Sequence, residues 1–176
     1  GNIIVDDATG LPQQGEFMAF GTGVHPNTMG IRNSFRIGDV GFSFLLDMKT
    51  GGFIYNATNA YAYFRGLHLN TLDGRDGGVG AATAEDYYSN IAFNITEEFV
   101  QEADFMRLRE IVLNYDLPNS IMNNLPIEGI GLSVSARNVA LLWSKTDNID
   151  PESTYDSGNA QGLEMFGVPR TRSFNA

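Results

Sequence analysis

Apolar and polar residues alternate with a period of two along several segments of the chain, which is the pattern of β-strands with one buried and one polar face. Residues 40–48 illustrate it, because Phe42 and Phe44 fall on one face while Ser43 and Asp47 fall on the other. The cleanest alternation covers 130–143. We predict strands at residues 31–37, 40–48, 105–117, 130–143 and 170–176.

Two local features refine these strands. Gly38 and Asp39 separate the first two strands and suit a two-residue hairpin turn, because Gly accepts a positive φ without steric cost. In the third strand, residues 106–109 fit the opposite phase to residues 111–116, so we expect a β-bulge near 108–110.

The remaining segments, residues 1–30, 49–103 and 144–168, carry many glycines and no dominant period, and we predict loops there. Within the longest, residues 56–63 suit a strand, and 83–89 and 97–102 suit short helical turns. Short and long connections therefore alternate, as in membrane barrels with short periplasmic turns and long extracellular loops.

These patterns predict an all-β fold, an antiparallel up-and-down segment of a transmembrane β-barrel with long extracellular loops. A strand over 40–48 would cover about 23 Å when tilted, close to the ~25 Å apolar band of such barrels. About eight strands are needed to close a barrel, so we expect the five predicted strands to be part of a larger one. The alternative is a secreted or surface-tethered β-sandwich that binds glycans.

Composition narrows the chemistry. The 176 residues carry a net charge of −10, which argues against nucleic acid as a partner because phosphates require Lys and Arg. The absence of cysteine removes disulfides, thiolate nucleophiles and Cys-ligated metals.

Nothing in the sequence indicates catalysis. His25 and His68 are the only histidines and lie far apart in predicted loops, and no hydrolase, zincin or P-loop motif is present. The acidic run at 147–152, with Asp156, offers oxygen ligands for Ca²⁺, but Asx turns in a proline-stiffened loop explain it better. We expect no enzyme activity, no cofactor and no metal.

Five arginines on the predicted strands are expected to face the barrel lumen, since an arginine in lipid at mid-depth costs about 2–4 kcal/mol. There they would pair with carboxylates inside the lumen or with Asp47 and Glu110 on neighbouring strands, or contact an anionic substrate; structural pairing is the preferred interpretation. These lumen-facing charges are Arg32, Arg36, Arg107, Arg109 and Arg137.

Tyr87, Tyr88 and Trp143 are the candidate substrate-binding residues, because flat aromatic faces pack on the apolar faces of sugar rings. Interface girdles and packing within a loop are the alternative roles for the same side chains.

Several stretches, in the same order along the chain, resemble the C-terminal barrel region of SusC/RagA-family TonB-dependent outer-membrane transporters. The strongest are ADFMRLRE at 103–110, YDLP at 115–118, SARN at 135–138, DPE at 150–152 and PRTR at 169–172.

The resemblance implies a barrel of about 22 strands with an N-terminal plug, of which this chain supplies a C-terminal part without the plug. Carboxylates of that plug are then possible partners of the lumen-facing arginines. It also implies a Gram-negative outer-membrane location, contact with membrane lipid, a SusD-like surface lipoprotein as partner, and coupling to the TonB complex through the plug. The implied function is energised uptake of large nutrients, namely oligosaccharides or peptides.

Overall fold

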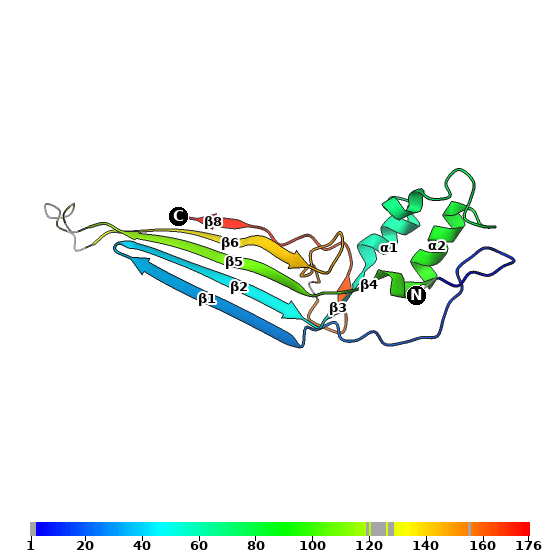
Figure 1. Cartoon of the computed structure of the whole chain (residues 1–176), viewed down its shortest axis with the longest axis horizontal. Helices are drawn as coiled ribbons and strands as arrows, with labels where there is room; N and C mark the ends of the chain where they lie inside the picture. Colours follow the sequence, from blue (N-terminus) through cyan, green and yellow to red (C-terminus); the bar gives the residue numbers. More distant parts are fainter. Residues whose placement is uncertain (1–2, 119, 121–125, 127–128, 155) are drawn as a thin grey trace.

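The computed structural model describes residues 3–118, 120, 126, 129–154 and 156–176. They form one long antiparallel sheet with a helical lobe and a small second sheet at one of its ends (Figure 1). The strand order of the long sheet is β1 (Asn27–Ile37), β2 (Val40–Thr50), β5 (Phe105–Asp116), β6 (Gly131–Ser144) and β8 (Ser173–Asn175). The sheet is open, with β1 and β8 at its edges.

The strands of the long sheet follow one another in up-and-down order, each antiparallel to its neighbour. The first predicted strand is longer than expected, since β1 begins at Asn27. The last one is shorter, since β8 covers only Ser173–Asn175 of the predicted 170–176.

The predicted hairpin turn between β1 and β2 is confirmed. Ile37 pairs directly with Val40, which leaves Gly38 and Asp39 as the two central residues. Gly38 has a φ of +58°, and Asp39 is not among the residues with positive φ. A positive φ at the first central residue alone is the pattern of a type II′ turn, whose twist matches that of the flanking strands.

The predicted β-bulge in β5 is also confirmed. The pairing of β5 with β6 shifts between Leu108 and Glu110, and the pairing with β2 shifts between Leu45 and Leu46. In the pairing with β2, Arg109 is the extra residue. A bulge changes the phase of a strand, so residues before and after it present charged side chains to the same face of the sheet.

The opposite face of the long sheet is apolar and open. Phe42 lies against Phe44 with ring centroids 6.1 Å apart, and Phe35 of β1 joins them at 6.4 Å from Phe44. Phe35 is 52% exposed and Leu132 is 58% exposed, so no layer covers this face among the described residues. The sheet therefore does not form the core of a β-sandwich.

Connections of different size gather at opposite ends of the sheet. Figure 1 shows the β1–β2 turn at one end, beside the last residues of β5 and the first residues of β6, and the helical lobe at the other end. The segments that directly follow β2 and β6, residues 51–104 and 145–154, both lie at the lobe end, and residues 166–172 run back along β6 to β8.

Residues 53–102 form the lobe rather than an irregular loop. Its small sheet has the order β4 (Val100–Glu102), β3 (Phe53–Asn56), β7 (Leu163–Glu164), with β7 parallel to β3. Its helices are α1 (Ala57–Phe64), η1 (Leu69–Leu72), α2 (Ala84–Asn94) and η2 (Thr96–Phe99).

The strand predicted at 56–63 is wrong, because α1 occupies these residues. Asn56 is the N-cap, and its side-chain Oδ1 accepts a hydrogen bond from the Asn59 N–H at 2.8 Å. Such a cap satisfies a backbone donor that the helix itself cannot pair, and it outweighs the β-propensity of the two tyrosines that follow. The predicted helical turn at 83–89 corresponds to the first part of α2. Thr83 is the N-cap of this helix, and its side-chain hydroxyl accepts a hydrogen bond from the Asp86 N–H.

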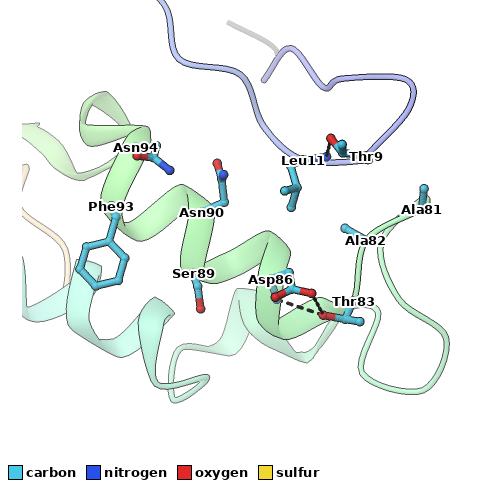
Figure 2. A pocket seen from close by; sticks show the side chains of 10 residues that line it. All are labelled: Thr9, Leu11, Ala81, Ala82, Thr83, Asp86, Ser89, Asn90, Phe93 and Asn94. Atoms are coloured by element: carbon cyan, nitrogen blue, oxygen red, sulfur yellow. Dashed lines mark hydrogen bonds between the residues drawn. The ribbon is translucent and has the colours of Figure 1, made fainter.

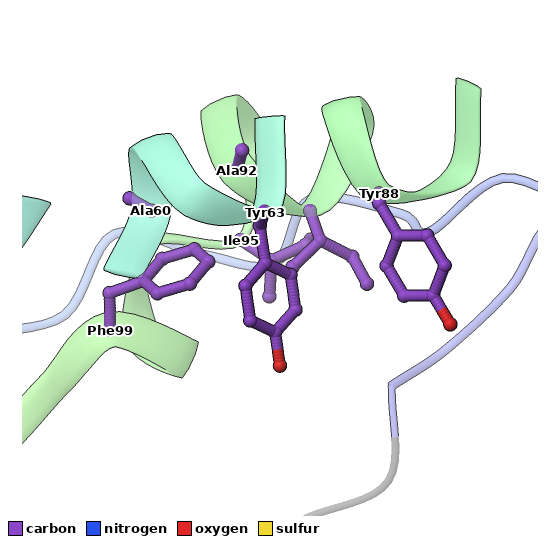
Figure 3. Packing of buried hydrophobic residues seen from close by; sticks show 7 residues of the cluster. Ala60, Tyr63, Tyr88, Ala92, Ile95 and Phe99 are labelled. Atoms are coloured by element: carbon purple, nitrogen blue, oxygen red, sulfur yellow. The ribbon is translucent and has the colours of Figure 1, made fainter. Parts of the chain in front are cut away.

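The lobe has its own hydrophobic core (Figure 3). Tyr63 of α1 packs edge-on against Phe99 at 5.1 Å and against Tyr88 at 6.0 Å. Ile91 and Ala92 of α2 complete the contact between the two helices. None of the helices among the described residues is long and apolar enough to cross a membrane.

Candidate functional site

The polar face of the long sheet carries ion pairs that link neighbouring strands. Glu110 of β5 accepts hydrogen bonds from Arg32 at 3.0 Å and from Arg137 at 3.2 Å. Arg36 pairs with Asp116 further along the same face. These arginines are largely exposed, and exposed pairs of this kind contribute about 0–1 kcal/mol each.

A denser cluster of charges surrounds Glu152 near the lobe end of this face. Arg109 Nη2 donates to Glu152 Oε1 at 2.5 Å, and Arg107 Nε lies 3.2 Å from Oε2 without the angle of a hydrogen bond. Lys49 and Arg170 add positive charge, each with a nitrogen 3.8 Å from Glu152. Four cations thus converge on one carboxylate whose side chain is only 8% exposed.

Arg107 and Arg109, the two arginines of the cluster that lie on β5, have further acidic partners. Arg107 Nη2 donates to both carboxylate oxygens of Asp150 at 2.7 and 2.8 Å, and its side chain is 4% exposed. Arg109 donates to Asp47 Oδ2 from Nε at 2.8 Å and from Nη2 at 2.6 Å. Buried charges are tolerated only when they are paired and hydrogen-bonded, so this cluster fixes segment 150–152 on the sheet.

The same segment is also tied to the helical lobe. Asn56 donates from Nδ2 to the backbone carbonyl of Asp147 at 2.9 Å. Asn148 donates to Asn59 Oδ1 at 2.9 Å. The stretch from 147 to 152 therefore connects the start of α1 to the charge cluster on the sheet.

Glu164 is a second buried carboxylate that holds the lobe together. It is fully buried, and it accepts hydrogen bonds from the Thr58 N–H at 3.1 Å, from the Thr58 hydroxyl at 2.8 Å and from the Gly167 N–H at 2.8 Å. Thr58 lies in the first turn of α1, where an anion is favoured by the helix dipole. Glu164 thus anchors the 164–167 segment to α1.

The arginines predicted to face the lumen therefore share one face of the sheet, and each has an acidic partner. The predicted pairing with Asp47 and Glu110 is confirmed for three of them, Arg109, Arg32 and Arg137. Arg107 is paired instead with the acidic loop, a contact between residues distant in sequence that the strand pattern did not indicate.

The acidic loop uses its carboxylates for these arginines and for its own turns. Asp150 Oδ1 accepts the Glu152 N–H at 2.9 Å, and Asp156 Oδ1 accepts the Gly158 N–H at 2.6 Å, as expected of Asx turns. Within the described part of the chain, no group of three or more acidic or histidine side chains could hold a metal ion.

The two histidines have structural contacts rather than solvated loop positions. His25 Nε2 lies 2.8 Å from the Ala103 carbonyl, and its ring packs edge-on against Phe105 at 5.8 Å. His68 accepts the Asn70 N–H at its Nδ1 and stacks on Tyr63 at 4.7 Å.

The structure does not bring the three candidate substrate-binding aromatics together. Tyr88 is 8% exposed and belongs to the core of the lobe. Tyr87 packs edge-on against Tyr88 at 5.3 Å and is half-buried. Trp143 lies on β6 opposite Met106, in the long sheet. A buried ring offers no free face to a sugar, so Tyr88 is unsuited to the role, whereas Tyr87 and Trp143 stay candidates.

Burial also changes the acidity of the lobe tyrosines. Desolvation raises the pKa of Tyr88 above its ordinary value of 10.0, and the nearby Asp73 carboxylate adds to the rise. Desolvation likewise raises the pKa of Tyr63, although a hydrogen bond from Asn70 works against it. Both phenols are neutral at any physiological pH.

Two surface hollows lie near these elements. The larger, of about 440 Å³, runs along the outer face of α2 below the N-terminal segment (Figure 2). Its lining includes Leu11, Ser89, Asn90, Phe93 and Asn94. The smaller, of about 280 Å³, is more polar and lies between segments 23–28 and 154–161 next to Lys49 of the charge cluster.

Glu152 and Glu164 are the residues that sequence reasoning did not single out. Glu152 stood in a recognised acidic run, but its role depends on which strand the loop reaches. Glu164 carried no local signal, since its partner Thr58 is 106 positions away.

The chain is similar to a class of outer-membrane receptor. It is 26% identical over 155 residues to TonB-dependent receptor P3 of Formosa agariphila, and the match covers 84% of the chain but 15% of that protein. No family model matches the chain.

Solved structures show the same fold. The structure of the RagAB peptide transporter matches 88% of the chain with a TM-score of 0.65 and 18% identity, over 17% of its own chain. The RagAB peptide importer in its open-open state matches 98% of the chain with a TM-score of 0.64 and 17% identity, over 19% of its own chain. These findings confirm the resemblance read from the sequence and are consistent with a piece of a SusC/RagA-type receptor. The chain spans less than a fifth of the proteins it matches, which are a receptor and transporters rather than enzymes.

Proposed function

We propose that this chain forms part of the barrel wall and of the extracellular loops of a TonB-dependent outer-membrane transporter of the SusC/RagA type. The observation that carries the proposal is the two-sided long sheet, which has an open apolar face and an opposite face covered with paired charges. An apolar outside and a polar inside are what a transmembrane barrel requires. The similarity to TonB-dependent receptor P3 and to RagAB supports the same assignment.

In this proposal the apolar face contacts lipid and the charged face borders the lumen. Arg32, Arg36 and Arg137 extend along the inner wall, and the Glu152 cluster lies near its outer end. The helical lobe and the 145–172 segment shape the extracellular mouth. The β1–β2 turn then lies on the periplasmic side, because it is at the opposite end of the sheet (Figure 1).

The whole transporter is proposed to import large nutrients, oligosaccharides or peptides, together with a SusD-like surface lipoprotein and with energy from the TonB complex. The similarity to a RagAB structure described as a peptide transporter supports uptake of large polar substrates. Tyr87 is the better placed of the two remaining aromatic candidates, because it lies in the lobe, whereas Trp143 lies in the sheet at the lobe end.

The topology can be tested with an epitope inserted at the exposed Asp76 of the full-length protein. We expect antibody to label intact cells, because Asp76 lies in the lobe. A matched epitope between Gly38 and Asp39 should be labelled only after the outer membrane is permeabilised. Labelling of both sites, or of neither, in intact cells would contradict the topology.

The orientation of the wall can be tested with single cysteines, since this chain has none of its own. The cysteine of Ser43→Cys should react with a water-soluble maleimide that enters the lumen. The cysteine of Phe42→Cys should not react, because lipid shields it from the reagent. The reverse pattern would place the charged face against the membrane and exclude the proposal.

A further inference from the structure

Four aromatic rings form a continuous row on the surface of the lobe, which we call the aromatic strip. Phe93 of α2 contacts Phe64 at 4.9 Å, Phe64 contacts Tyr61 at 5.9 Å, and Tyr61 contacts Phe166 at 5.4 Å. The two end rings are open to solvent, with Phe93 67% exposed and Phe166 57% exposed. In Figure 2 the Phe93 ring projects from α2 away from the N-terminal segment. The strip thus joins residues from three separate parts of the chain on one surface.

Phe166 is held in the strip at a cost in backbone strain. Its φ is +60°, a left-handed conformation that is unusual for a bulky side chain. The turn around it is fixed on both sides: Glu164 accepts the Gly167 N–H, and a Cβ on Gly167 would stand 2.3 Å from the Ser153 carbonyl oxygen. Strain of this kind persists only where the surroundings enforce it, and it concentrates at functional sites. The ring contacts Tyr61 but stays 57% exposed, so most of its surface is free for a partner.

The geometry of the strip fits protein side chains better than sugar rings. Neighbouring ring planes are inclined at 60° to 85°, so they do not form a flat floor. The Arg65 guanidinium covers two of the rings, 4.6 Å from the centroid of Phe64 and 5.1 Å from that of Tyr61. Exposed aromatic rings together with an arginine are the composition of a protein-interface hot spot.

The charge of the lobe specifies the partner further. Residues 57–102 contain seven Asp or Glu and two Arg, which gives a net charge of −5. Complementary potentials favour association and exclude other partners. The matching surface must therefore have an apolar hollow for the Phe93 and Phe166 rings within a basic surround.

We propose that the aromatic strip is the docking surface for a surface lipoprotein partner whose contact region is apolar at its centre and basic at its rim. Phe166 and Phe93 are the anchors, and the strained turn at Phe166 keeps one anchor ready for binding. The inference rests on the proposed function, which places the lobe outside the membrane and supplies the partner.

The test compares three variants of the full-length transporter purified in mild detergent from the native host. Phe166→Asn removes the ring but suits the left-handed backbone, because asparagine tolerates positive φ. Phe93→Ser removes the other anchor. Leu69→Asn is the matched control, since Leu69 is 79% exposed on η1 outside the strip. The readout is the amount of palmitate-labelled lipoprotein that co-purifies per transporter.

We expect Phe166→Asn and Phe93→Ser to lower co-purification at least tenfold, and Leu69→Asn to leave it unchanged. Amide hydrogens of the lobe should exchange as slowly in Phe166→Asn as in wild type, or more slowly, because the substitution relieves backbone strain. Loss of the lipoprotein from a lobe that is still stably folded separates a binding role of Phe166 from a structural one. Wild-type co-purification should also fall as salt is raised, as expected for an acidic surface with a basic partner.

Three outcomes would overturn the inference. Unchanged co-purification in both strip variants would place the docking surface elsewhere, with the proposed function intact. Retained lipoprotein with weakened binding of labelled oligosaccharide or peptide would make the strip a substrate contact. Wild-type transporter without any lipoprotein would remove the partner from the proposed function as well.

Discussion

The long sheet and the helical lobe are stabilised in opposite ways. Among its described residues the sheet buries only Phe105 and Arg107, both at its lobe end; elsewhere one face is apolar and open, and the other is polar and paired. The lobe buries an aromatic core between α1 and α2 and exposes polar and apolar residues alike. The sheet depends on what surrounds it, whereas the lobe depends on its own packing. A change in one region should therefore leave the other largely intact.

The largest effect is expected from Phe99→Ala in the lobe. Phe99 is 2% exposed and packs against Tyr63 and Tyr55, so its removal should destabilise the lobe by about 3–5 kcal/mol. Limited proteolysis of intact cells should then cut the lobe. The folded barrel, seen on electrophoresis as a band whose mobility changes when the sample is boiled, should persist. Phe93→Ala, which removes an exposed ring of the same type, is the control and should resist cleavage. Loss of the barrel band in Phe99→Ala would show that the two regions are not independent.

Phe44→Arg tests the other half of the comparison. Phe44 lies on the apolar face of β2, and an arginine facing lipid at mid-depth costs about 2–4 kcal/mol. The heat-shifted band in the outer-membrane fraction should therefore decrease. Ser43→Arg on the polar face should assemble almost normally. Equal assembly of the two variants would mean that the apolar face is not the lipid contact.

Glu152→Gln addresses the connection between the two regions. In this variant Arg107 still pairs with Asp150, and Arg109 still pairs with Asp47. The free energy of unfolding should therefore fall by about 2–3 kcal/mol, which is less than when a buried charge loses its only partner. Hydrogen exchange should become faster in segment 147–153. Glu110→Gln, in a more exposed pair, should cost about 0–1 kcal/mol and is the control. If segment 147–153 exchanged its amide hydrogens equally slowly in both variants, Glu152 would not be the main link between the sheet and this segment.

The smallest effect is a pH dependence confined to the lobe. Burial raises the folded-state pKa of Tyr63 and Tyr88 above their ordinary 10.0, so the neutral phenols are fully compatible with the fold below pH 10. Above it the unfolded chain gains stability by ionising, and the lobe should loosen as pH rises through the folded-state pKa values. Protease sensitivity measured from pH 9 to 11 should increase in wild type and less in Tyr88→Phe. A rise of equal size in both would point to another titrating group.

The sequence predicted the sheet well because its signal is local. The alternation along β2 and β6 follows from the two-sided environment of each strand, and the turn at Gly38 is set by two adjacent residues. The bulge at Arg109 in the pairing with β2 was visible as a change of phase. The lobe was predicted less well: the start of α2 was expected as a helical turn, but α1 is a single short helix whose buried residues pack against α2 and Phe99. Residues 56–63 favoured a strand by composition, and the Asn56 cap with the packing of Tyr63 made them a helix.

The antiparallel strands, the polar face of the arginines and the resemblance to a SusC/RagA-type receptor could all be read from the amino-acid sequence, since period and motif are properties of neighbouring residues. Three contacts became visible in the folded chain: Glu152 lies among four cations, Glu164 accepts hydrogen bonds from Thr58, and Phe166 extends a row of exposed rings. The partners in those contacts are up to 106 positions apart in the chain. Loop closure over such distances depends on the whole fold, because the entropy cost must be offset by contacts that form together.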